Sequence, residues 1–146
     1  EASIYATGAR TDAAAILIVE VDGPPEAVAA EAAIVEPLLR AHGARSVTVA
    51  TSAADRSRLW LGRKKAFGAL GRLAPDLAVQ DAVVPRSALP DLLDLIAAVR
   101  DRLGLRISNV FHAGDGNLHP CISFDRRDPR QAAAVETATV RLMLPS

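Results

Sequence analysis

The sequence predicts an α+β fold: a ferredoxin-like sandwich in which a mostly antiparallel sheet carries helices on one face. Three observations lead to this class. Short β-branched runs alternate with stretches of helical periodicity along the chain. One pair of runs is joined by a tight hairpin motif, which makes that pair antiparallel. The 146 residues, half of them hydrophobic, suffice for one core. A doubly wound parallel sheet is the alternative.

The first predicted strand and helix open the chain. Residues 15–21 form a β-branched-rich run that ends at an Asp-Gly pair, which is typical of a buried strand. A helix is expected to begin after Pro24 and to reach about His42, because apolar residues recur at helical spacing. Gly43 stands where a helix usually ends in the left-handed conformation.

A second strand and helix follow with the same signals. Residues 46–49 alternate β-branched and polar side chains, which predicts a short strand. Ser52 is a candidate N-cap for a helix that runs to about Leu73 and stops before Pro75.

The last part of the chain predicts three strands and two helices. A third strand is expected over 77–84 and a helix from about Leu89 to Leu103, ended by Gly104. Strands over 106–112 and 118–124 are separated by the hairpin motif, and Asp128 with the following proline opens a final helix.

Composition excludes several classes of protein. Seventeen basic and seventeen acidic residues cancel, so the basic excess usual for nucleic-acid binding is absent. Cys121 is the only cysteine, which excludes an intramolecular disulfide. No secretory leader is evident, and the longest apolar run is far shorter than the roughly 20 residues of a membrane helix. We expect a cytoplasmic protein with no transmembrane segment.

The ends of the sequence suggest a piece of a longer protein. Glu1 is not a natural start, and the last residues, 140–144, read as a helix still in progress. We therefore expect residues 1–146 to form a single domain that is one fragment of a larger chain.

The hairpin motif carries the most chemical information. If Asp115 and Gly116 form a two-residue turn, His112 pairs directly with His119 and both imidazoles point to the same face. Two imidazoles make half a site for a divalent ion such as zinc, manganese or iron. The alternative is a partly exposed cross-strand pair without a ligand. A third ligand is not identified, because Asp115 as a turn residue tends to bond its own backbone.

A second candidate lies on the helix that follows Ser52. At helical spacing Trp60, Arg63, Lys64 and Phe67 share one face. Arg63 is able to hold a carboxylate through a bidentate pair. The alternative is a surface arginine whose stem packs on Trp60.

Two further features favour structural roles. Residues 81–86 run from a strand end into a turn and either line a site or contribute to the core and surface. Cys121 is expected to be a buried, inert thiol.

These motifs together resemble a known family. The stretch 112–120, His-Ala-Gly-Asp-Gly-Asn-Leu-His-Pro, is similar to the signature of FAD-linked oxidases of the vanillyl-alcohol oxidase type, in particular the glycolate oxidase and D-lactate dehydrogenase branch. Residues 62–67, 71–72, 75–76 and 84–90 match the same family in the same order. The resemblance covers essentially the whole chain.

The resemblance implies a two-domain flavoprotein of which this chain is most of the substrate-binding cap. FAD is then bound mainly by a separate domain of the same chain. His112 and His119 are implied to bind the divalent metal (zinc, manganese or iron), Arg63 the carboxylate of a 2-hydroxy-acid substrate, and Asn117 the flavin or the substrate. The catalytic base and a further metal ligand belong to a Glu-His-Gly segment that this sequence does not contain.

The resemblance also bears on substrate and partners. Relatives that oxidise 2-hydroxyglutarate carry asparagine where this chain has Cys121, which favours glycolate or D-lactate. Other oxidase subunits are implied as partners, through which the protein would lie at the inner membrane. The fragment alone is expected to be inactive. The competing hypothesis is a non-catalytic ferredoxin-like module that binds a small ligand or a partner.

Overall fold

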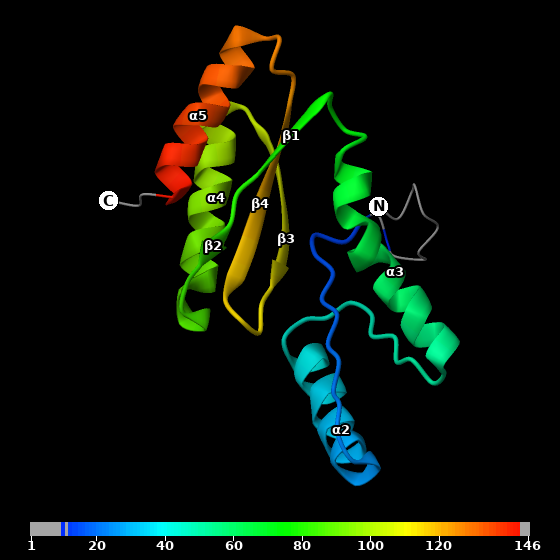
Figure 1. Cartoon of the computed structure of the whole chain (residues 1–146). Helices are drawn as coiled ribbons and strands as arrows, with labels where there is room; N and C mark the ends of the chain where they lie inside the picture. Colours follow the sequence, from blue (N-terminus) through cyan, green and yellow to red (C-terminus); the bar gives the residue numbers. More distant parts are fainter. Residues whose placement is uncertain (1–9, 11, 144–146) are drawn as a thin grey trace. The chain divides into compact units, whose positions relative to one another are not determined.

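A computed structural model of the chain describes residue 10 and residues 12–143 (Figure 1). The chain divides between Gly62 and Arg63 into two compact units. Within the part of the chain that is described, no helix combines the length and the apolar character needed to cross a membrane.

The unit that ends at Gly62 contains α2 (Pro25–Ala41) and the first half of α3 (Ala53–Leu70). The residues predicted to bound these helices lie where expected, one after the end of α2 and one before the start of α3. Gly43 follows α2 with φ of +85°, and the Ser52 hydroxyl accepts the Asp55 N–H at 3.1 Å. Both predicted helices are confirmed, and α3 ends three residues before the expected position.

The two strands predicted for this unit are wrong. Between residues 12 and 62, neither 15–21 nor 46–49 pairs with a strand. Their apolar side chains are largely exposed, with Ile16 at 58%, Leu17 at 61% and Val49 at 59%. β-branched residues favour a pleated, half-buried surface, but a strand forms only where a neighbour accepts its backbone hydrogen bonds. Neither run has such a neighbour here.

Glu20, inside the first of these runs, is instead tied to α3. Its carboxylate accepts hydrogen bonds from the Arg56 guanidinium and from the Trp60 indole N–H. Trp60 is thereby held by Glu20.

The unit that begins at Arg63 is built around one central strand. Strand β4 pairs antiparallel with each of the other strands of its four-stranded sheet. The antiparallel prediction is confirmed for the described residues, and the parallel alternative is wrong. The strands are β1 (Asp76–Val79), β2 (Ala82–Val83), β3 (Arg106–His112) and β4 (Asn117–Phe124).

The strand predicted over 77–84 is thus two short strands on the same edge of β4. Val79 pairs with Cys121 and Ala82 with Leu118, so the register runs on unchanged across the gap between them. Inside that gap the Gln80 N–H still donates to the Pro120 carbonyl at 2.9 Å.

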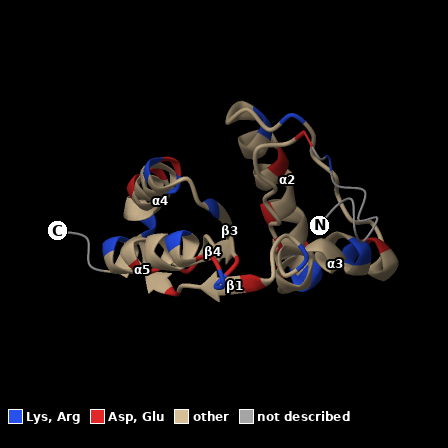
Figure 2. Cartoon of the chain, turned by 90° about the horizontal axis from the view of Figure 1, so that it is seen from above, with Lys and Arg blue, Asp and Glu red and all other residues tan. Residues whose placement is uncertain are grey.

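The hydrophobic core lies on one face of the sheet. Leu118 and Ile122 of β4 are fully buried beneath α4 (Leu89–Leu103) and α5 (Pro129–Met143) (Figure 1). The predicted covering of one face by helices is confirmed for these two. The helices α4 and α5 each carry acidic and basic residues (Figure 2). The helical residues of the core are Leu89, Leu92, Ile96, Val99, Val135, Ala138 and Leu142.

The hairpin register differs from the prediction. His112 pairs with Asn117 and not with His119, because the loop has four residues, 113–116. The Asp115 N–H donates to the His112 carbonyl at 3.1 Å, which closes a turn earlier in the chain than the predicted one. The shift is by two residues, and only a shift by an odd number moves side chains to the other face. His112 and His119 therefore stay on one face as diagonal neighbours.

Gly116 holds the hairpin loop against the chain that leaves β2. Its carbonyl accepts the Val84 N–H at 3.0 Å, and its φ is +73°. A Cβ at this position would lie 2.0 Å from the Val84 carbonyl oxygen, whereas one at Gly114 would meet nothing within 4 Å. Only glycine fits at 116, both for its conformation and for the approach of Val84.

We therefore expect Gly116→Ala to destabilise this unit strongly, with Gly114→Ala as the matched control. The left-handed conformation alone costs alanine about 1–2 kcal/mol, and the clash with the Val84 backbone adds to it. Chemical denaturation of both variants measures the difference. Equal midpoints for the two would contradict this close approach.

Candidate functional site

The face of the sheet opposite α4 and α5 carries the predicted metal ligands. Because side chains alternate along a strand, the residues of β4 that face away from the core include Asn117 and His119. His112 of β3, paired with Asn117, lies on the same face. The two imidazole rings are 6.1 Å apart between centroids and nearly perpendicular, at 88°. The structure thus brings the two histidines together, as predicted, through a different register.

Two residues of α3, one helical turn apart, contact these rings. The Arg63 Nη2 atom lies 3.1 Å from Nε2 of His112. The Phe67 ring meets the His119 ring edge to face, with centroids 6.2 Å apart. The spacing of four residues along a helix explains why both side chains reach the same site.

The contact with Arg63 favours one tautomer of His112. A guanidinium has only donor groups, so the imidazole nitrogen it meets must accept. Nε2 of His112 therefore carries a lone pair, and in the neutral ring the proton is on Nδ1. That is the protonation state in which an imidazole is able to bind a metal.

Asn117 leaves an acceptor unused on this face. Its Oδ1 atom is buried and has no hydrogen-bond partner within the described chain. A buried polar atom without a partner costs about 1–3 kcal/mol. This cost would be recovered if a ligand supplied a donor or a cation there.

Asp81 also belongs to the site and was not singled out by itself in the sequence. It lies between β1 and β2, where the unchanged register places it opposite His119. Its Oδ1 atom is 3.6 Å from Nδ1 of His119. The signal that could have found it is a carboxylate inside the strand run 77–84, whose other residues are apolar except for Gln80.

The donors on this face are fewer than a metal site needs. Over residues 12–143 no group of three or more His, Cys, Asp or Glu side chains is placed to hold an ion. Asp115, the loop carboxylate, is exposed and contributes its N–H to the turn. His112 and His119 contribute two imidazoles, a ligand type that divalent ions accept, and the unpartnered Asn117 oxygen lies on the same face.

Cys121 lies two residues after His119 on β4, and its predicted burial is confirmed. It is fully buried, and its Sγ donates to the His119 carbonyl at 3.2 Å. Burial raises the pKa of the thiol, which keeps it neutral at physiological pH.

Cys121 is accordingly expected to resist a thiol reagent at pH 8 in the native protein. It should react once denaturant exposes it, because the thiolate is the reactive species. Absorbance on release of the reagent's chromophore follows the reaction. Rapid stoichiometric labelling under native conditions would contradict the burial.

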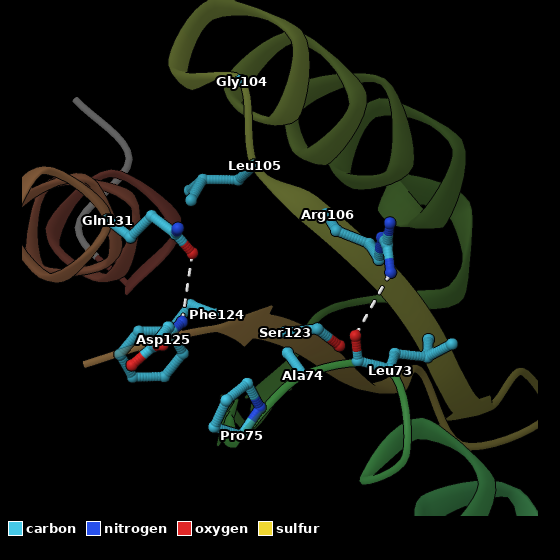
Figure 3. Close-up of a pocket in the computed structure, with 10 residues that line it drawn as sticks. All are labelled: Leu73, Ala74, Pro75, Gly104, Leu105, Arg106, Ser123, Phe124, Asp125 and Gln131. Carbon is cyan, nitrogen blue, oxygen red and sulfur yellow. Dashed lines mark hydrogen bonds between the residues drawn. The ribbon is translucent and has the colours of Figure 1, made fainter. Parts of the chain in front are cut away.

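A pocket lies at the other end of the sheet (Figure 3), with a volume of about 410 Å³. Ser123 in this pocket is four residues from His119 along β4, about 13 Å at the usual rise per residue. Its hydroxyl is buried without a partner among the described residues. The pocket is separate from the histidines. Its lining residues are Leu73, Ala74, Pro75, Gly104, Leu105, Arg106, Ser123, Phe124, Asp125 and Gln131.

Comparison with known proteins supplies the family. Residues 1–144 match the family described as FAD linked oxidases, C-terminal domain. The chain is 45% identical to glycolate oxidase subunit GlcD of Escherichia coli (strain K12) over 129 residues, which cover 88% of this chain and 26% of that protein. It is 35% identical to the subunit of the same name from Bacillus subtilis (strain 168), over 90% of this chain and 28% of that protein.

A third relative has a different name. The mitochondrial D-lactate dehydrogenase [cytochrome] of Arabidopsis thaliana is 29% identical over 90% of this chain and 24% of its own length. The chain thus spans about a quarter of the length of these relatives. Because the family match extends over nearly all of its residues, the chain belongs to the C-terminal domain family of the FAD-linked oxidases.

Proposed function

We propose that this chain forms the substrate-binding part of the cap domain of an FAD-dependent 2-hydroxy-acid oxidoreductase that oxidises glycolate or D-lactate. The family and the names of the relatives support this reaction class. In this proposal FAD is held mainly by another domain of the same protein. The isolated chain would then be inactive, because most flavin contacts and the catalytic base lie outside it.

The observation that carries the proposal is the gathering of four side chains on one face. Arg63 comes from α3, His112 from β3, and Asn117 and His119 from β4. This set offers a cation for a carboxylate, two imidazoles for a divalent ion and an unused amide oxygen. A 2-hydroxy acid presents a carboxylate and a hydroxyl that match these groups.

Each residue has a distinct part in binding. Arg63 would hold the substrate carboxylate through two parallel N–H···O bonds. His112 and His119 would hold the divalent ion. When bound, that ion lowers the pKa of the coordinated hydroxyl and so eases its deprotonation. The Asn117 Oδ1 would accept a hydrogen bond from the substrate or the flavin.

Arg63 would also compete with the proposed metal for one nitrogen of His112. The single lone pair on Nε2 of His112 is occupied by the Arg63 guanidinium in this structure. The same lone pair is unable to serve a metal at the same time. Metal binding to this nitrogen would therefore release Arg63, which would free its donors for the substrate carboxylate.

The proposal extends to partners. Two relatives are named as subunits of glycolate oxidase, which favours association of the complete protein with other oxidase subunits. Attachment to the inner membrane would then come through those subunits.

The metal role is tested by His112→Ala and His119→Ala in the complete protein. Loss of an outer-shell partner already costs 10–100-fold in metal affinity or activity, so loss of a ligand should cost more than about 100-fold. Elemental analysis of the bound metal and kcat/KM for glycolate and D-lactate are the measurements.

The matched control is His42→Ala, since His42 lies just beyond α2 in the other unit. It should retain both metal and activity. Full metal content and full activity in the two site variants would overturn the metal role and favour a non-catalytic module.

The role of Arg63 is tested by Arg63→Lys in the complete protein. Lysine keeps the charge but loses the planar pair of donors, and hydrogen bonds to charged groups contribute about 1.5–3 kcal/mol. We expect kcat/KM for the hydroxy acid to fall about 10–100-fold. Arg106→Lys at the far end of β3 is the control, and an equal effect of the two would contradict the assignment.

A further inference from the structure

We infer that Asp81 is a positioning residue for His119: its carboxylate accepts the Nδ1–H of the ring and leaves Nε2 free to bind the metal. The inference rests on the proposed metal role of His119 and adds a residue that the family match does not assign. It is carried by the strand register, the contact between the two side chains, and the protonation state that the contact selects.

The register places Asp81 beside His119 independently of its side-chain conformation. β1 and β2 keep one register on β4, with Val79 opposite Cys121 and Ala82 opposite Leu118. Counting across the gap puts Asp81 directly opposite His119. Directly opposed residues have Cβ atoms about 4.5–5.5 Å apart and point to the same face. The carboxylate is therefore kept next to this imidazole by the sheet itself.

The contact between the side chains involves the nitrogen that a positioning residue needs. Oδ1 of Asp81 lies 3.6 Å from Nδ1 of His119, which is within ion-pair distance and longer than a hydrogen bond. A carboxylate is an acceptor, so it selects the form of the ring with the proton on Nδ1. Metal-binding histidines almost always donate their second ring N–H in this way, which fixes the ring and makes it a stronger ligand.

The two rings that contact His119 among the described residues do not provide this acceptor. The Phe67 ring meets it edge to face, and Nε2 of His112 already accepts from Arg63. Arg63 and Asp81 thus act on the two histidines in complementary ways. Arg63 meets Nε2 of His112, and Asp81 meets Nδ1 of His119, so both neutral rings carry the proton on Nδ1.

The exposure of the pair makes a clean experiment possible. The Asp81 side chain is 68% exposed, whereas that of His119 is 18% exposed. The charge removed at 81 is itself exposed, and surface substitutions of this kind change stability by about 0.5 kcal/mol or less. A change in metal binding is then separable from a loss of fold.

The test compares Asp81→Asn with the wild type in the complete protein, after removal of bound metal. Titration calorimetry with Zn²⁺ measures affinity. Long-range ¹H–¹⁵N spectra of protein labelled on histidine report which ring nitrogen of His119 carries the proton. We expect Zn²⁺ affinity to fall about 10–100-fold. The wild-type ring should carry its proton on Nδ1, and the variant should lose this preference.

Asp94→Asn is the matched control, because Asp94 is an exposed carboxylate on α4. It should match the wild type in both measurements. Unchanged Zn²⁺ affinity in Asp81→Asn, or a wild-type His119 protonated on Nε2, would overturn the role of Asp81. If the wild type binds no Zn²⁺, the proposed metal site fails, and the spectra still decide whether Asp81 sets the protonation of His119.

Discussion

The pairing of β4 on both of its edges is the constraint on which the site depends. One edge pairs with β3 and the other with β1 and β2. Because side chains alternate along each strand, every second residue points to the core and the others point to the opposite face. Leu118 and Ile122 anchor the core side beneath two helices. Because their burial fixes the register, it also fixes where Asn117 and His119 point.

This arrangement explains how an interrupted sheet brings polar side chains from several segments to one place. Asn117 and His119 share strand β4, and the other polar side chains come from different segments. Asp81 reaches the site from one edge of β4 and His112 from the other. Arg63 arrives from α3, whose contacts with the rings lie on the face left open by α4 and α5. The Arg63 guanidinium lies against the His112 ring, and the Asp81 carboxylate lies against the His119 ring.

Local signals predicted local structure well. Ser52, Gly104 and Asp128 sit at helix ends where capping chemistry needs them, since Gly104 has φ of +62° and Asp128 accepts the Arg130 N–H at 2.9 Å. Helix boundaries depend on such neighbours in sequence, so a single sequence contains the necessary information.

Pairing between distant segments was predicted less well, because it depends on contacts that periodicity does not encode. Residues 15–21 have the composition of a strand but no partner in their unit. The hairpin register was missed because Gly116 bonds to Val84, a residue from another strand connection. The predicted grouping of His112 and His119 nevertheless survived, since a shift by two residues preserves the face. Asp81 was predicted only as part of the segment 81–86, because its place opposite His119 follows only from the observed pairing.

The gap between β1 and β2 has a mechanical consequence. Gln80 points to the core face, where its side-chain amide donates to the Thr139 hydroxyl of α5 at 2.9 Å. The next residue, Asp81, points to the opposite face and meets His119. Two consecutive residues therefore make contacts on opposite faces of the sheet. The helical face of the sheet and the histidine face are therefore joined through two consecutive residues, so a change in the packing of α5 and a change at His119 would meet at the same short connection.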